Sequence, residues 1–161
     1  MRDPQRSRID ILISFVLTVF IVIFDRITKN YFEDLLDLGQ TLPVIPDIFH
    51  FTLVYNTGIA FGLFKDQGVV FIIIPVIAII LLVFNIYYFR QNGEVISRGY
   101  MLAFSLILAG AMGNLYDRIT YGYVIDFFDF RIWPVFNIAD SAITIGAVII
   151  AWKCFRLSSD K

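Results

Sequence analysis

The sequence predicts an integral membrane protein, mostly α-helical, with four transmembrane helices and a small β-cradle on the outer (periplasmic) side. Of its 161 residues, 58% are hydrophobic and only 17% are charged, and the mean hydropathy is +0.76. A soluble domain usually has about 25% charged residues, so a soluble globule of this composition would expose large apolar patches. The uncharged residues also gather into four long segments. Residues 1–161 are therefore expected to form one membrane domain.

The same composition excludes several other classes of protein. Intrinsic disorder requires few apolar residues, and a nucleic-acid module requires a basic surface that a net charge of -1 does not provide. One cysteine excludes an internal disulfide framework and a cysteine-clustered metal site, and one histidine excludes histidine-rich metal sites. No metal, no cofactor and no nucleic-acid partner are therefore expected.

Four segments are long enough, or nearly so, to cross a bilayer. A spanning helix needs about 20 apolar residues, and the first segment has only 14. That segment could instead be a signal peptide, but Phe24-Asp25-Arg26 follows it in place of a small-residue cleavage site, which favours an uncleaved span. The predicted spans are 11–24, 69–89, 99–116 and 132–152.

The basic residues predict the orientation of these spans. Four spans place both termini on one side, and that side holds 8 of the 13 lysines and arginines. Cytoplasmic segments carry an excess of basic residues, so both termini are expected in the cytoplasm. Ten of the 14 acidic residues lie at or beyond the opposite, outer interface.

The outer connection, about residues 30–65, is too apolar to be a linker. Residues 49–55 alternate in the period of a strand, which predicts a β-ribbon with His50 pointing away from it. Asn56-Thr57-Gly58 then breaks the alternation as a hairpin turn would, and the glycine also permits a close approach of backbone.

Two polar blocks flank the outer ends of the first and third spans. Asp25 and Lys29 are four residues apart and can pair on one helix face, either as a structural ion pair or in a functional role. Asn114, Asp117 and Arg118 share another helix face, where Arg118 would offset the charge of Asp117 near a helix end.

Two further blocks place aspartates near the fourth span. Asp126 and Asp129 lie among phenylalanines, where partial burial would raise the pKa of a carboxyl group. The alternative is that both aspartates are solvated. Of the two, we expect Asp129 to be solvated. Asn137 is positioned to be the N-cap of the last helix, and Asp140 lies on the same face in the first turn. An acid within an apolar span usually has a partner or a function.

These residues favour carboxylate-pair chemistry. His50 alone cannot build a serine–histidine–aspartate triad, Cys154 lies at the cytoplasmic end as an apolar filler, and only Lys29 could serve Ser141 in a dyad. Two neighbouring aspartates share one proton, so one can deprotonate a water while the other protonates a departing amide nitrogen. A carrier that uses Asp140 and Asp25 as titrating sites is the alternative, but it would need acids throughout the membrane depth, and here they lie on one side.

Five motifs together resemble a known family. DRITK, NTGIAFG, GNLYDR, VIDF and FNIAD occur in this order between residues 25 and 140 of a four-span chain. The set resembles lipoprotein signal peptidase (signal peptidase II). The resemblance implies an aspartyl endopeptidase of the bacterial inner membrane that cuts prolipoproteins before a diacylglyceryl-modified cysteine. It also implies contact with membrane lipid, and we expect a monomer.

The resemblance also implies roles for individual residues. Asp126 and Asp140 match the catalytic dyad, and the 13 residues between them are compact for the family. The residues that match a supporting or structural role are Asn56, Gly58, Asn114, Arg118 and Asn137, which hold substrate or support the dyad, and Asp25, Lys29 and Asp117, which are structural polar groups beside it.

Overall fold

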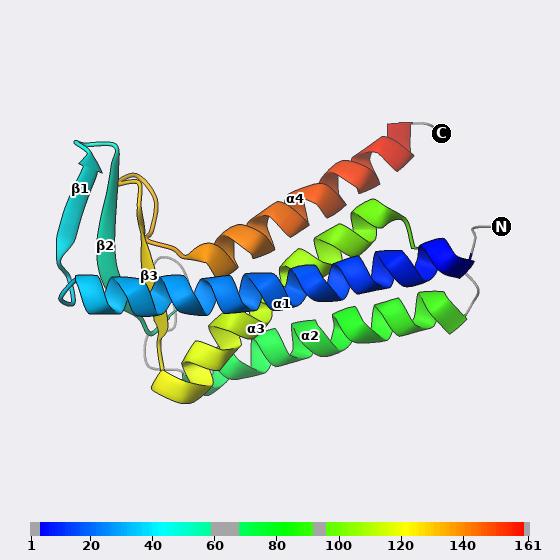
Figure 1. Ribbon diagram of the computed structural model, residues 1–161, viewed down its shortest axis with the longest axis horizontal. Coiled ribbons are helices and arrows are strands. Elements are labelled where there is room, and N and C mark those ends of the chain that lie inside the picture. The colour runs from blue at the N-terminus through cyan, green and yellow to red at the C-terminus, as the bar shows by residue number, and fades with distance from the viewer. Residues whose placement is uncertain (1–3, 59–67, 92–95, 160–161) are drawn as a thin grey trace.

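The computed structural model describes residues 4–58, 68–91 and 96–159, in which helices run side by side and a three-stranded antiparallel sheet covers one end (Figure 1). The start of α1 and the end of α4 both lie at the end away from the sheet. The helices are α1 (Pro4–Leu35), α2 (Gly68–Gln91), α3 (Arg98–Tyr121) and α4 (Ile138–Ser159); the strands are β1 (Thr41–Ile45), β2 (Phe49–Asn56) and β3 (Val124–Asp129).

Three of the described helices are long and apolar enough to cross a membrane: Ile9–Leu35, Arg98–Tyr121 and Ile138–Arg156. The first is much longer than the predicted span 11–24, and it continues into the region predicted to be β-rich. The reason is that Asp25 and Lys29, which end the uncharged segment, form an ion pair inside the protein and do not interrupt the helix.

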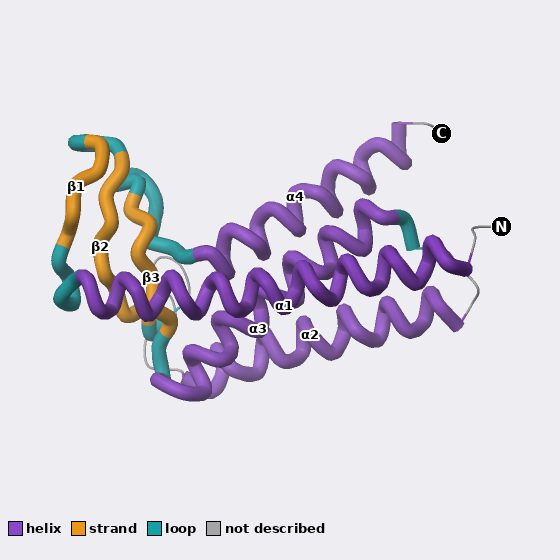
Figure 2. Tube along the Cα trace, in the orientation of Figure 1, coloured by secondary structure: helices purple, strands orange, loops and turns teal. Residues whose placement is uncertain are grey.

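The sheet has the order β1-β2-β3, so β2 is its central strand (Figure 2). The pattern of residues 49–55 predicted β2, but the third strand comes from the motif VIDF, where the sequence predicted only an aromatic-rich outer segment. Gly122 makes this strand possible, because its φ of 82° ends α3 with a hydrogen bond from its N–H to the Arg118 carbonyl. The chain can then turn directly into β3.

An apolar core joins the sheet to the end of α1. The ring centroids of Phe32 on α1 and Phe127 on β3 lie 4.3 Å apart, and the centroid of Phe51 on β2 lies 4.5 Å from that of Phe32. This packing fixes the sheet against the helices at the level where the polar motifs lie. The buried residues of this core are Phe32, Leu36, Leu53, Ile125 and Phe127.

Glycines bring α3 and α4 into backbone contact. A methyl group on Gly110 would overlap the carbonyl oxygen of Ala139, and one on Gly146 would lie 2.7 Å from the carbonyl oxygen of Ala103. Small residues at such crossings allow helices in lipid to pack closely. The contact of Gly110 with Ala139 holds the first turn of α4 against α3.

Gly110→Ala is therefore expected to destabilise the protein. The added methyl meets backbone, which cannot move without separating the two helices, and overpacking of this kind costs about 1–3 kcal/mol. Thermal unfolding of the purified protein in detergent measures the change. The control is Thr120→Ala, an exposed position on the same helix, which should unfold at nearly the wild-type temperature. Equal unfolding temperatures for Gly110→Ala and wild type would contradict the close contact.

Candidate active site

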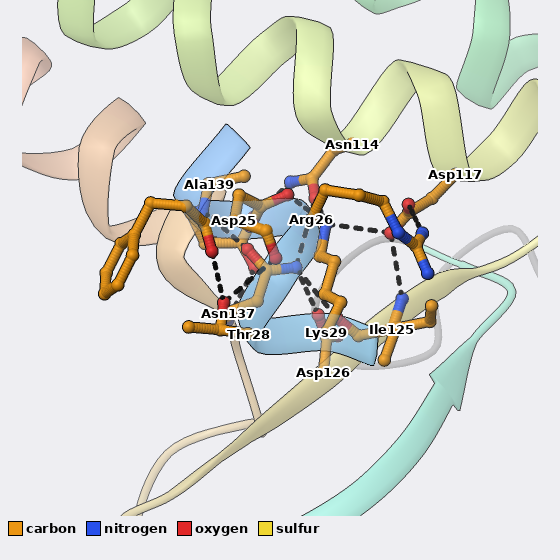
Figure 3. A network of polar contacts seen from close by, with 12 residues as sticks. Asp25, Arg26, Thr28, Lys29, Asn114, Asp117, Ile125, Asp126, Asn137 and Ala139 are labelled. Carbon is orange, nitrogen blue, oxygen red and sulfur yellow. Dashed lines mark hydrogen bonds and ion pairs between the residues drawn. The ribbon is translucent and has the colours of Figure 1, made fainter. Parts of the chain in front are cut away.

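A buried lysine lies at the centre of the polar groups at the sheet end of the bundle (Figure 3). Lys29 on α1 is 0% exposed, and its Nζ lies 2.7 Å from Asp25 Oδ2, 2.8 Å from Asp117 Oδ2 and 3.1 Å from Asn114 Oδ1. An ammonium has three N–H donors and no acceptor, so these contacts use all of its donors. The predicted pair of Asp25 and Lys29 is confirmed, and α3 supplies the other two partners.

The two carboxylates that hold Lys29 also contact other elements. Asp25 Oδ1 accepts a hydrogen bond from the backbone N–H of Ala139 at 2.9 Å, at the start of α4. Asp117 Oδ2 accepts one from the backbone N–H of Ile125 at 3.3 Å, in β3. Through these contacts, the charge on Lys29 links α1, α3, β3 and α4.

Arg26 is a participant that the sequence analysis did not assign. Its Nη1 lies 3.0 Å from Asp117 Oδ1, and its guanidinium lies 5.1 Å from the centre of the Tyr121 ring. The sequence predicted that Arg118 would offset the charge of Asp117, and the two do interact electrostatically. Lys29 and Arg26 also form ion pairs with Asp117. The sequence feature that could have indicated a role for Arg26 is its position inside the motif DRITK.

Asp126 lies in β3 and is 1% exposed. Its Oδ1 accepts a hydrogen bond from Asn137 Nδ2 at 2.7 Å, and its Oδ2 accepts one from Asn56 Nδ2 at 2.9 Å. Burial, together with the nearby charge of Asp140, raises the pKa of Asp126 to about 8. Asp126 is therefore mostly protonated at neutral pH.

Asp140 lies in the first turn of α4, where the helix dipole favours a negative charge. Its Oδ1 accepts a hydrogen bond from Asn114 Nδ2 at 2.7 Å, and its Oδ2 accepts one from the backbone N–H of Asn137 at 3.2 Å. Its own N–H donates to Asn137 Oδ1 at 2.9 Å, which confirms Asn137 as the N-cap. These donors support a charged Asp140.

One amide connects the two aspartates. Asn137 is 0% exposed, and it bonds Asp126 through Nδ2 and Asp140 through both Oδ1 and its backbone N–H. The same Nδ2 lies 3.0 Å from Asn114 Oδ1. The structure therefore brings Asp126, Asp140, Asn114 and Asn137, from three separate motifs, into one hydrogen-bonded cluster.

Asn56, Gly58 and Arg118 lie beside this cluster. The side-chain Oδ1 of Asn56 accepts the backbone N–H of Gly58 at 3.0 Å, which closes the predicted turn and aims Asn56 Nδ2 at Asp126. Residues 59–62 of the same motif are outside the described residues. Arg118 is partly buried, its Nη1 lies 3.4 Å from the carbonyl oxygen of Asn114, and it interacts electrostatically with both Asp126 and Asp140.

Two expectations about the sheet are wrong. Asp129 is not solvated: it is 5% exposed and accepts hydrogen bonds from Thr52 Oγ1 at 2.7 Å and Arg131 Nη1 at 3.0 Å. Burial alone would raise the pKa of Asp129, but the bonds from Thr52 and Arg131 outweigh it and hold this pKa below its ordinary value. His50 is buried, because β2 is a central strand that pairs His50 with Pro43 on one side and Asp129 on the other.

The cluster has the components of acid–base hydrolysis. Asp126 holds a proton and Asp140 accepts two N–H donors, so together the two carboxyl groups can deprotonate a water and protonate a leaving group. Within residues 4–58, 68–91 and 96–159, no group of three His, Cys, Asp or Glu side chains is placed to hold a metal ion. Cys154 is exposed near the far end of α4, away from the cluster.

The sequence matches the family model of signal peptidase (SPase) II over residues 17–156, which include the whole cluster. The chain belongs to the signal peptidase II family. It is therefore a membrane protein and an aspartic-type protease, as the resemblance implied.

Individual relatives agree with this assignment. The chain is 40% identical to a lipoprotein signal peptidase of Halothermothrix orenii over 84% of this chain and 90% of that protein. It is 42% identical to one of Pseudomonas syringae pv. tomato over 87% and 84% of the two chains. A solved bacterial membrane enzyme, determined by the in meso method at 2.3 Å resolution, is 36% identical with a TM-score of 0.81 over 92% of this chain and 90% of that one.

The raised pKa of Asp126 predicts how the stability of this signal peptidase II family member depends on pH. Its folded-state pKa of about 8 lies above the ordinary value of 3.8, so the folded state binds more protons in that interval. The contribution of Asp126 to stability is therefore present at acid pH and lost as the pH rises through about 8. We expect the unfolding temperature to fall less between about pH 5 and about pH 9 in Asp126→Asn than in the wild type.

Asp129→Asn is the matched control for this measurement. The pKa of Asp129 is lowered, so its contribution is present above its ordinary pKa and lost only as the pH falls below that value. Its unfolding temperature should follow the wild-type slope across the same alkaline range. Parallel curves for Asp126→Asn and wild type would rule out a protonated, buried Asp126.

Proposed function

We propose that this protein removes the signal peptide from diacylglyceryl-modified bacterial prolipoproteins by cutting before the lipidated cysteine. The curated relatives described above are named lipoprotein signal peptidase, and none of these findings supports the carrier alternative. The observation that carries the proposal is the pair of carboxyl groups, Asp126 and Asp140, that both accept hydrogen bonds from Asn137, the first from its side-chain Nδ2 and the second from its backbone N–H, in a chain of this family.

We infer that Asp126 and Asp140 are the catalytic dyad, with different roles. Asp140, which accepts two N–H donors at a helix N-terminus, takes a proton from the attacking water. Asp126, which holds its proton at neutral pH, donates that proton to the departing amide nitrogen. The pair then holds one proton as before, but on Asp140, and transfer of that proton to Asp126 restores the starting state.

The neighbouring polar residues fit supporting roles. Asn56 holds Asp126 and is itself held by the backbone of Gly58, so the turn after β2 sets the position of the acid. Arg118 carries a positive charge beside both aspartates, where it can stabilise negative charge that develops on the scissile carbonyl. We assign both residues, with Asn114 and Asn137, to holding substrate or supporting the dyad.

We propose that the protein crosses the membrane four times and that α2 is a span in addition to the three helices named above. A helix of 24 residues is about 36 Å long, which exceeds the roughly 30 Å hydrocarbon core. The arrangement in Figure 1 supports an even number of crossings, because the start of α1 and the end of α4 lie at one end and the sheet at the other. Because the terminal side carries the excess of basic residues, we place both termini in the cytoplasm and the dyad at the outer face of the inner membrane. We also propose that the protein is a single-domain monomer.

The dyad is tested by single-turnover cleavage of a purified, diacylglyceryl-modified prolipoprotein. General acid and base groups contribute about 10²–10⁴-fold each, so Asp126→Asn and Asp140→Asn should each lower the rate at least about 100-fold. The double variant should be little slower than either single variant, because the two groups act as a unit. Because the enzyme and the substrate are both purified, other proteases do not contribute to the cleavage.

Asp129→Asn is the control, because this aspartate lies on the same strand but bonds Thr52 and Arg131 and no member of the dyad. It should keep the rate within about tenfold of wild type. The same precursor without its diacylglyceryl group tests the lipid requirement, and it should be cut far more slowly because the anchor aligns the scissile bond. An inactive Asp129→Asn beside an active Asp126→Asn would overturn the assignment.

The orientation is tested with a reporter enzyme that is active only in the periplasm. Inserted at Gln40, between α1 and β1, the reporter should be active; fused after Lys161, it should be silent. The expected difference follows from the 8 basic residues on the terminal side. Activity at Lys161 would refute the four-span arrangement.

A further inference from the structure

The hydrogen bonds around Lys29 determine the orientation of two side-chain amides. Lys29 Nζ can only donate, so the Asn114 atom that faces it at 3.1 Å must be the carbonyl oxygen Oδ1. The other end of that amide, Nδ2, then faces Asp140 Oδ1 at 2.7 Å and donates to it. The lysine at one end of the amide and the Asp140 carboxylate at the other both favour this orientation of Asn114.

The second amide follows by the same logic. The backbone N–H of Asp140 can only donate, so Asn137 turns Oδ1 toward it, at 2.9 Å, and turns Nδ2 toward Asp126. That Nδ2 also reaches Asn114 Oδ1 at 3.0 Å, the same oxygen that Lys29 holds. With the two amides fixed, both oxygens of Asp126 and both oxygens of Asp140 accept from N–H groups.

We propose that Lys29 is a positioning residue of the active site, which holds the Asn114 amide so that it donates to Asp140 and accepts from the Asn137 amide that donates to Asp126. This inference rests on the proposed function, because it assigns the dyad to these aspartates. Lys29 contacts neither aspartate directly in the bonds described, and it acts on them through the two asparagines. It thereby keeps N–H donors, and not carbonyl oxygens, facing the carboxyl groups of both aspartates.

Lys29 and Arg26 differ in a way that separates positioning from structural charge pairing. Both cations lie on α1 and both bind Asp117, through Oδ2 and Oδ1 respectively. Only Lys29 reaches Asn114, and its positive charge also opposes the rise in the pKa of Asp126. Among the described residues, Lys29 on α1 and Arg118 on α3 are cations that act electrostatically on the dyad. Lys29 pairs in turn with Asp25 and Asp117, and Arg26 pairs with Asp117.

The test compares Lys29→Gln with Arg26→Gln in cleavage of the diacylglyceryl-modified precursor. Glutamine can donate or accept, so Lys29→Gln removes the obligate donor that holds Asn114 Oδ1 and weakens the preference of Asn114 for this orientation. We expect kcat to fall at least tenfold with KM within about threefold, and the alkaline limit of the pH profile to move to higher pH, because Asp126 loses a nearby positive charge. Arg26→Gln should keep the wild-type pH profile. A wild-type kcat and profile in Lys29→Gln would overturn the proposal.

A double-mutant cycle with Asn114→Ala tests the route. Asn114→Ala keeps both ion pairs of Lys29, to Asp25 and Asp117, and removes the amide through which Lys29 is proposed to act. If Lys29 acts through Asn114, the double variant should be no slower than the slower single variant. Multiplying effects on kcat would overturn the proposal, since they would mean that Lys29 acts independently of Asn114.

Folding and the proposed function are controlled separately. If Lys29→Gln does not purify as a folded protein, Lys29→Gln plus Asp25→Asn removes one buried charge of each sign and is compared in the same assay. Failure of the proposed function would appear as no cleavage by the wild type, or as full activity of Asp126→Asn. Failure of this inference would appear as wild-type behaviour of the Lys29 variant in an assay where Asp126→Asn is inactive.

Discussion

The buried ammonium of Lys29 is the constraint on which the polar end of this protein depends. Removing an ammonium from water costs several kcal/mol unless charged and hydrogen-bonding partners replace the water. Asp25 and Asp117 supply the charges, and Asn114 supplies the third acceptor. The two carboxylates also accept hydrogen bonds from backbone N–H groups at the start of α4 and in β3. The partners of the Lys29 ammonium therefore hold α1, α3, β3 and α4 together.

Around this centre, apolar packing sets the distances. The glycines of α3 and α4 allow the helices to approach until Gly110 meets the Ala139 carbonyl, and the same turn of α4 carries Asp140. On the other side, Phe32 and Phe127 fix β3, and therefore Asp126, against α1. The two aspartates are thus positioned by different packing contacts, and Asn137 bridges them.

Asp126 illustrates a conflict between stability and function. Burial raises its pKa to about 8, and this burial works against stability at neutral and alkaline pH because the unfolded chain would release the proton. The same burial keeps a carboxylic acid protonated at the pH where a proton donor is needed. Asp129, three residues further along β3, differs because Thr52 and Arg131 stabilise its charged form.

The sequence by itself determined the membrane class, the strand at residues 49–55, the N-cap Asn137, the pair of Asp25 and Lys29, and the motifs that indicate the family. Each depends on spacing along one element or on residue type, which a sequence contains directly. It did not determine that VIDF forms a third strand, that Asp129 and His50 are buried, or that Arg26 pairs with Asp117. Those outcomes depend on which elements lie side by side, because burial and pairing between distant residues arise only when packing brings α1, α3, β3 and α4 together.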